Sequence, residues 1–315
     1  MRKFLLKRIL IMIPVFFGMT VLIFFLTNLT PGSPVDAMVT PDMTPEAIEA
    51  LYHRMGLDQP VYVQYLKWLG RLFQGNLGYS FRTNQTVVKV IGERVGPTLM
   101  LMGAALAVAA IVGIALGVVA ACKPYSIWDY CASGLSFIGA GIPNFFMALI
   151  FIYFFSIKMH WLPTGGMYTN ASVKSAADIL HHLLQPALVL SLSMVGSYIR
   201  QTRSSMLEVL GEEYIKMSRA KGMRERVVLY SHALRNAMMP IATQIGMSVP
   251  MLIGGAVVTE QIFGWPGMGS LMVTSINFRD YPVIMGVTVF ITITVMIVNL
   301  LMDILYALLD PRVRN

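Results

Sequence analysis

The sequence is poor in charge. Asp, Glu, Lys and Arg make up 13% of its 315 residues, whereas hydrophobic residues make up 56%. A globular protein carries roughly 25% charged residues. So few charges cannot cover a water-soluble surface, and a disordered chain needs a much lower hydrophobicity. The composition therefore excludes a soluble or disordered chain and predicts an integral membrane protein.

The sequence also lacks the common signatures of an enzyme. It contains no GxxxxGK[ST], GxSxG or HExxH motif. Cys122 and Cys131 are too few for a disulfide framework. The adjacent His181 and His182 would point in different directions on a helix, so they make a poor metal pair. We therefore expect no catalytic residue and no metal site on this chain.

Six long runs are free of Asp, Glu, Lys, Arg and His. A bilayer core about 30 Å thick needs roughly 20 apolar residues in a helix, and continuous runs favour helices over barrel strands. The first run is too long for a signal peptide, so we expect an uncleaved anchor. The fourth is short, and we expect it to extend through Arg200 and Arg203, whose long side chains can reach the interface. The runs are Ile9–Leu29, Pro97–Ala121, Tyr130–Ile157, Leu183–Ile199, Ala237–Thr259 and Tyr281–Met302.

The distribution of charge predicts the orientation. With the N-terminus in the cytoplasm and six alternating spans, the inner segments hold 15 of the 24 Lys and Arg residues and seven of the 16 acids, so they carry the whole net charge of +8. The positive-inside rule then places both termini in the cytoplasm. We expect three parts: an anchor helix over residues 1–29, an extracytoplasmic, partly helical loop over 30–96, and a five-span core over 97–315.

The long outer loop contains helix signals. Thr44 is a suitable N-cap, Pro45 suits the first helical position, and Gly56 suits the position after the last turn. A second helix is predicted over Val61–Phe73, with leucines on one face. The loop could cap the outer membrane surface or dock a soluble partner, and both alternatives remain open.

The long cytoplasmic connection, residues 204–238, predicts a helix, a glycine break and a second helix. Acids precede bases over Glu212–Lys221, as the helix dipole favours, and Gly222 can end that helix in the left-handed conformation. A second helix is predicted from about Arg224, with one apolar face. That face would hold Val227, Tyr230 and Leu234. Such a hairpin is either a surface amphipathic element or a helix pair that fits a cleft in another protein.

The polar residues that occur within the apolar runs are all neutral, so the sequence does not support ion coupling or a proton relay. Such residues either bond between helices or line a path for a polar solute. Four are candidates for the path: Ser136, Asn144, Gln244 and Ser248.

Small residues recur at every fourth position of the second run, and prolines interrupt two others. Ala105, Ala109, Gly113 and Gly117 predict a close helix contact, either within the chain or with a second membrane subunit. Pro143 and Pro250 predict local bends.

Several stretches together resemble a known family. Glu213–Gly222, followed by His232–Ala237 and Pro240, is similar to the coupling loop of bacterial ABC importer permeases, and more narrowly to the first permease subunit of dipeptide, oligopeptide and nickel importers. The general motif of such permeases begins Glu-Ala-Ala where this chain has Lys216, Met217 and Ser218, and the peptide branch departs there as well. Three further stretches agree with that branch: Gly56–Pro60 with Gly75–Gly78, Pro266–Gly269, and Leu308–Arg312.

The resemblance implies an all-α type I ABC importer permease of six transmembrane helices in a bacterial cytoplasmic membrane. It would be a transport subunit and not an enzyme, with di- or oligopeptides as substrate and nickel chelates or glutathione-like solutes as the alternative. The implied partners are a second homologous permease, two ATPase subunits that hold ATP and magnesium, an extracytoplasmic binding protein, and membrane lipid, but no nucleic acid. The implied ATPase-coupling residues are Glu213, Tyr214, Arg219, Ala220, Lys221 and Gly222.

Overall fold

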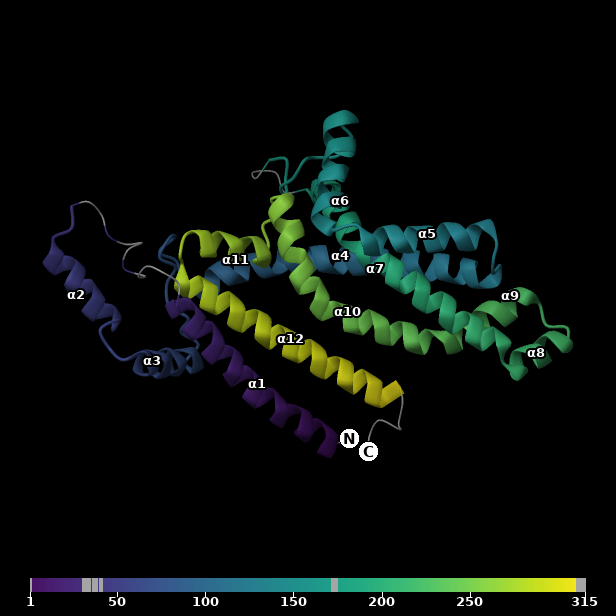
Figure 1. Cartoon of the computed structure of the whole chain (residues 1–315), viewed down its shortest axis with the longest axis horizontal. Helices are drawn as coiled ribbons and strands as arrows, with labels where there is room; N and C mark the ends of the chain where they lie inside the picture. The colour runs from purple at the N-terminus through teal and green to yellow at the C-terminus, as the bar shows by residue number, and fades with distance from the viewer. Residues whose placement is uncertain (1, 30–34, 36–38, 40–41, 171–174, 310–315) are drawn as a thin grey trace. The chain divides into compact units, whose positions relative to one another are not determined.

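The computed structural model describes residues 2–29, 35, 39, 42–170 and 175–309, and these residues are predominantly helical (Figure 1). Their single β-type pairing is an isolated bridge between Tyr79 and Thr86. A helix bonds its own backbone groups, which a bilayer core cannot do for it. The chain divides into two compact units. The first is Met1–Gly96 with Ser270–Leu300, and the second is Pro97–Gly269 with Leu301–Asn315.

Within the part of the chain that the structure describes, five helices are long and apolar enough to cross a membrane, and a sixth span is formed if one bent pair is counted. That pair is α5 (Ile127–Gly141) with α6 (Asn144–Phe151), which continues as the π-helix η1 (Ile152–Lys158). The two halves meet at 107°. The bend predicted at Pro143 is therefore confirmed, but it is sharper than a local bend, because it breaks the predicted span Tyr130–Ile157 into two helices. Pro143 lacks an N–H and stands just before α6, so the first helix cannot continue through it.

Unit 1 holds the anchor helix and the two predicted loop helices. In α2 (Pro45–Met55) the Thr44 hydroxyl accepts the Ala47 N–H at 3.3 Å, and Gly56 ends the helix at φ 69°. Helix α3 spans Val61–Phe73. Both predicted helices and the two caps of α2 are confirmed. The predicted leucine face of α3 is not, because Leu66 is exposed and the buried residue is Trp68.

An aromatic cluster holds α3 against α1 (Arg2–Leu29). The ring of Phe24 lies 5.4 Å from that of Tyr65 and 5.7 Å from that of Trp68. Val289 of α12 (Tyr281–Leu309) completes the cluster, and α1 and α12 run side by side (Figure 1). Burial of these rings fixes the orientation of α3.

The buried carboxylate of Asp280 ties the loop before α4 (Val87–Cys122) to the start of α12. It accepts hydrogen bonds from the Ser80 hydroxyl and from the Phe81 N–H. A carboxylate is also favoured just before the N-terminus of a helix. The two connections of unit 1 are therefore held together by one side chain.

Unit 2 is built around α7 (Ala176–Gly211), which packs against α5 and against α10 (Arg235–Ile262). Its contact with α4 uses the stripe of small residues. A Cβ added at Gly113 would lie 2.5 Å from Cβ of Tyr198, and one at Gly117 would lie 2.5 Å from Cβ of Thr202. The sequence left open whether these small residues contact a helix of the same chain or a second membrane subunit. At Gly113 and Gly117 the contact lies within the chain.

A second buried carboxylate organises the end of α10. Glu260 is fully buried and accepts hydrogen bonds from the Thr98 hydroxyl at 2.6 Å and from the Gly269 N–H at 2.7 Å. These bonds fix the turn before α11 (Met268–Asn277) against α4. A buried carboxylate is tolerated when its oxygens are bonded in this way.

The glycine contact yields a stability prediction. Gly117→Ala should destabilise the chain by about 1–3 kcal/mol, because the new methyl group cannot fit beside Thr202. Gly103→Ala is the matched control, since an added Cβ there meets nothing within 4 Å. The measurement is the unfolding midpoint in mixed micelles. Equal midpoints for the two variants would contradict the proposed packing.

Candidate functional site

Residues Glu212–Arg226, here called the coupling hairpin, form a helix, a tight turn and the start of a second helix. Helix α8 spans Glu213–Ala220, and Gly222 follows it with φ 74°. The Gly222 N–H donates to the Arg219 carbonyl at 2.9 Å. A residue with a Cβ would be strained at this φ, by roughly 1–2 kcal/mol. The predicted glycine break is confirmed.

Helix α8 is fastened to the rest of unit 2 by the buried side chain of Ile215 and by a hydrogen bond from Asn236 Nδ2 of α10 to the Tyr214 hydroxyl at 2.9 Å. Ile215 is fully buried in a cluster with Met206 of α7 and with Val228 and Ala233 of the π-helix η2 (Val228–Leu234). The predicted coupling residues lie outside this cluster and are all exposed. They are Glu213, Tyr214, Arg219, Ala220, Lys221 and Gly222. The hairpin thus presents a continuous exposed surface, in which Tyr214 and Met217 lie beside charged groups and which can contact another molecule.

An ion pair closes the hairpin across its turn. Arg219 donates from Nη2 to Oε1 of Glu225 at 2.7 Å and from Nε to Oε2 at 3.2 Å. Glu225 begins the short helix α9 (Glu225–Val227). The hydrogen bonds to this carboxylate raise the pKa of Arg219. Because both side chains are half exposed, the pair contributes little to global stability. It joins α8 to α9 across the turn.

The face predicted for the second helix is wrong. Val227 and Tyr230 are exposed, whereas Val228, Ala233 and Ala237 are buried. The cause is the π-helix η2, whose wider turn replaces the spacing of an α-helix. This segment also runs without a break into α10, so the hairpin leads directly into a membrane helix.

Three of the four candidates for the solute path are engaged in hydrogen bonds. Ser136 is buried and donates to the Gly196 carbonyl, which joins α5 to α7. Gln244 donates to the Ser197 hydroxyl at 2.9 Å, and the Ser248 hydroxyl donates to the Gln244 carbonyl at 2.8 Å. Asn144 is partly exposed at the start of α6. A place on the path stays a prediction for all four.

The two adjacent histidines hold a loop. His181 Nε2 lies 2.9 Å from the Trp161 carbonyl oxygen, and His182 Nδ1 lies 3.0 Å from that of Gly165. Their rings are perpendicular, with centroids 6.4 Å apart. Within the described residues, no group of three or more His, Cys, Asp or Glu side chains could hold a metal ion.

An ion pair between α5 and α7 was not predicted from the sequence. Arg203 donates to both carboxylate oxygens of Asp129, at 2.7 and 2.8 Å. Helix α7 extends through Arg200 and Arg203, as predicted, and the long side chain of Arg203 pairs with an acid 74 residues away in the sequence. No local spacing pattern exists for such a separation.

Comparison with known proteins assigns the chain to a family. Residues 113–315 match the family described as "binding-protein-dependent transport system inner membrane component", and residues 1–102 match the corresponding N-terminal family. The chain belongs to this family of permeases. The family has the type I ABC permease fold, which confirms the predicted fold class. The side of the membrane that each terminus faces stays a prediction.

The permease has relatives of nearly the same length. A Brucella suis protein provisionally named a peptide permease is 46% identical over 317 residues, covering 100% of this chain and 99% of the relative. The oligopeptide transport system permease protein AppB of Bacillus subtilis is 44% identical, with 99% of each chain covered. The di/tripeptide transport system permease protein DppB of Pseudomonas aeruginosa is 40% identical, covering 100% of this chain and 99% of the relative.

The ion pair of the hairpin yields a second prediction. Glu225→Gln should leave the global unfolding midpoint nearly unchanged but increase amide hydrogen exchange over residues 218–226, because the turn loses its closing contact. Glu208→Gln, which removes an exposed acid of α7, is the control. If exchange in the hairpin is the same in both variants, the ion pair does not hold the turn.

Proposed function

We propose that the chain is the transmembrane permease subunit of an ATP-binding cassette importer that translocates di- or oligopeptides across the bacterial cytoplasmic membrane. The observation that carries the proposal is the 40–46% identity, over 99% or more of the chain, to relatives named for peptide, oligopeptide or di/tripeptide transport. None of these three is named for nickel or glutathione, so peptides are favoured over those solutes.

The energy source would lie on partner chains. The sequence contains no nucleotide-binding motif, and the family description itself names a binding protein as part of the system. We infer two ATPase subunits that hold ATP and magnesium, a second homologous permease that supplies the other half of the path, and an extracytoplasmic binding protein that delivers the solute.

The coupling hairpin would be the contact with one ATPase. Its six exposed residues suit a cleft on a partner, and the Arg219–Glu225 pair makes the hairpin a defined shape. It lies directly between α7 and the helical segment that becomes α10. A displacement of the hairpin would therefore be passed to two membrane helices, which could rock between inward-open and outward-open states.

The lining of the path would be neutral. Ser136, Asn144, Gln244 and Ser248 are uncharged, and the apolar runs contain no charged group. A neutral lining binds a zwitterionic peptide weakly, which allows its release after delivery by the binding protein. Asn144, which is partly exposed at the bend between α5 and α6, is the strongest of the four candidates.

Reconstitution tests the function. The test uses proteoliposomes that contain the permease, its partner permease, both ATPases and the binding protein. They should accumulate a labelled dipeptide only when ATP is supplied on the side of the membrane where the ATPases lie. A nickel chelate offered in place of the dipeptide should not accumulate. Transport of a nickel chelate alone would favour the alternative substrate, and transport by the purified chain without partners would contradict the proposal.

Charge reversal in the hairpin tests the coupling role. Glu213→Arg should lower peptide uptake at least about tenfold while ATP hydrolysis continues, because the hairpin surface no longer matches its cleft. Glu208→Arg, the same reversal outside the hairpin, should retain uptake. Uptake and hydrolysis are measured in the same proteoliposomes.

A charge swap separates coupling from structure. The double variant Arg219→Glu with Glu225→Arg restores an ion pair across the turn but inverts the exposed charges. Continued loss of uptake in the swap would support contact with a partner. Full recovery of uptake would mean that Arg219 acts only within the hairpin.

A further inference from the structure

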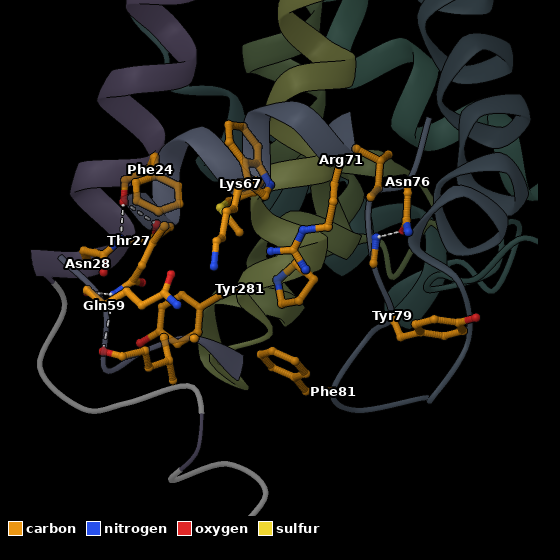
Figure 2. Close-up of a pocket in the computed structure, with 18 of the residues that line it drawn as sticks. Phe24, Thr27, Asn28, Gln59, Lys67, Arg71, Asn76, Tyr79, Phe81 and Tyr281 are labelled. Carbon is orange, nitrogen blue, oxygen red and sulfur yellow. Dashed lines mark hydrogen bonds between the residues drawn. The ribbon is translucent and has the colours of Figure 1, made fainter. Parts of the chain in front are cut away.

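Unit 1 contains a pocket with a volume of about 770 Å³ (Figure 2). Its walls are the end of α1, the turn between α2 and α3, the loop before α4 and the start of α12. The membrane-crossing part of α1 ends at Leu29, and that of α12 begins at Tyr281. Because Asn28 and Tyr281 both line the pocket, the pocket lies at the level where hydrocarbon gives way to lipid headgroups.

The charge in this pocket has one sign. Among the described residues, Lys67 and Arg71 line it, and no Asp or Glu does. They stand one turn apart on α3, where like charges repel each other. Within the described residues neither forms an ion pair, and both are exposed. Figure 2 shows both side chains extending from α3 into the pocket. An anion placed between them would relieve the repulsion.

The backbone of α3, which carries the two cations, is held in place. Tyr65 and Trp68 pack on Phe24. At its start, Gln64 donates to the carbonyls of Leu57 and Gln59, at 3.3 and 2.8 Å, which fixes the turn from α2. The two Cα positions are therefore fixed, and only the exposed side chains of Lys67 and Arg71 have to be ordered when an anion binds.

The pocket also offers an unused acceptor and several aromatic rings. The side-chain oxygen Oε1 of Gln59 is buried and has no hydrogen-bond partner within the described part of the chain. A ligand hydroxyl could satisfy it. Tyr79, Phe81 and Tyr281 add aromatic surface of the kind that proteins place at the membrane interface.

We propose that this pocket binds the headgroup of an anionic phospholipid. The phosphate lies between Lys67 and Arg71, with the guanidinium donating to two of its oxygens, and a headgroup hydroxyl donates to Gln59. Phosphatidylglycerol has both the negative net charge and the hydroxyl groups. Phosphatidylcholine has neither, and its choline would meet the two cations.

Lipid titration followed by native mass spectrometry tests the site on the full-length chain in nonionic detergent. The probes are dihexanoyl-phosphatidylglycerol, dihexanoyl-phosphatidylcholine, inorganic phosphate and dialanine. Lys67→Gln with Arg71→Gln should weaken phosphatidylglycerol binding about 10- to 30-fold, since each cation near a membrane surface contributes roughly three- to fivefold. Lys89→Gln with Arg94→Gln removes the same charge from unit 1 outside the pocket and should bind as the wild type does.

A conservative variant guards against a folding defect. Lys67→Arg with Arg71→Lys keeps both charges and should keep the binding. Equal loss in the pocket variant and the control variant would overturn the proposal, as would equal affinity for the two lipids. Inorganic phosphate bound as tightly as phosphatidylglycerol would indicate a free-anion site instead, and displacement of the lipid by dialanine would indicate a site for the peptide carboxylate.

Discussion

Every backbone polar group that enters the hydrocarbon of a membrane must find its hydrogen bond within the protein, and this constraint shapes the helices of the permease. It explains why the apolar runs form helices that bond their own backbone. It also explains why the helix is interrupted at Pro143, where the bond cannot be made. The buried carboxylate of Glu260 is retained because the Thr98 hydroxyl and the Gly269 N–H both donate to it.

Because the same hydrocarbon disfavours charged side chains, the charged groups that could bind a partner lie at or beyond the ends of the membrane helices. Exposed charged groups that could act on a partner are concentrated in the coupling hairpin, and two of those in unit 1, Lys67 and Arg71, line the pocket beside α3. The hairpin is joined to unit 2 by the burial of Ile215 against Met206 and Val228. Nearby, the Asp129–Arg203 pair fastens α7 to α5. Force applied to the hairpin therefore reaches a helix that is already bound to its neighbours, which suits a part that transmits motion.

Features set by local chemistry could be predicted from the sequence. The caps at Thr44 and Gly56, the helix over Val61–Phe73 and the break at Gly222 each depend on a few consecutive residues, and the structure confirms them. Features set by tertiary packing could not. Proline predicts a bend but not an angle of 107°.

The same limit applies to the candidate site. The exposed residues of the hairpin follow from the sequence, but its buried face does not, because the π-helix over Val228–Leu234 shifts the spacing. The Asp129–Arg203 pair and the pocket join residues that are far apart in the chain. The sequence also does not show which helix the small residues of α4 contact. In the structure Gly113 and Gly117 pack against α7.

The central claim is that the exposed hairpin faces the compartment that contains the ATPases. Its most direct test places one cysteine, Lys221→Cys, in a chain whose Cys122 and Cys131 are replaced by serine, and then applies a membrane-impermeant maleimide to oriented vesicles. We expect labelling in inside-out vesicles and none in right-side-out vesicles until the membrane is broken. Labelling of intact right-side-out vesicles would place the hairpin outside the cell and contradict the account.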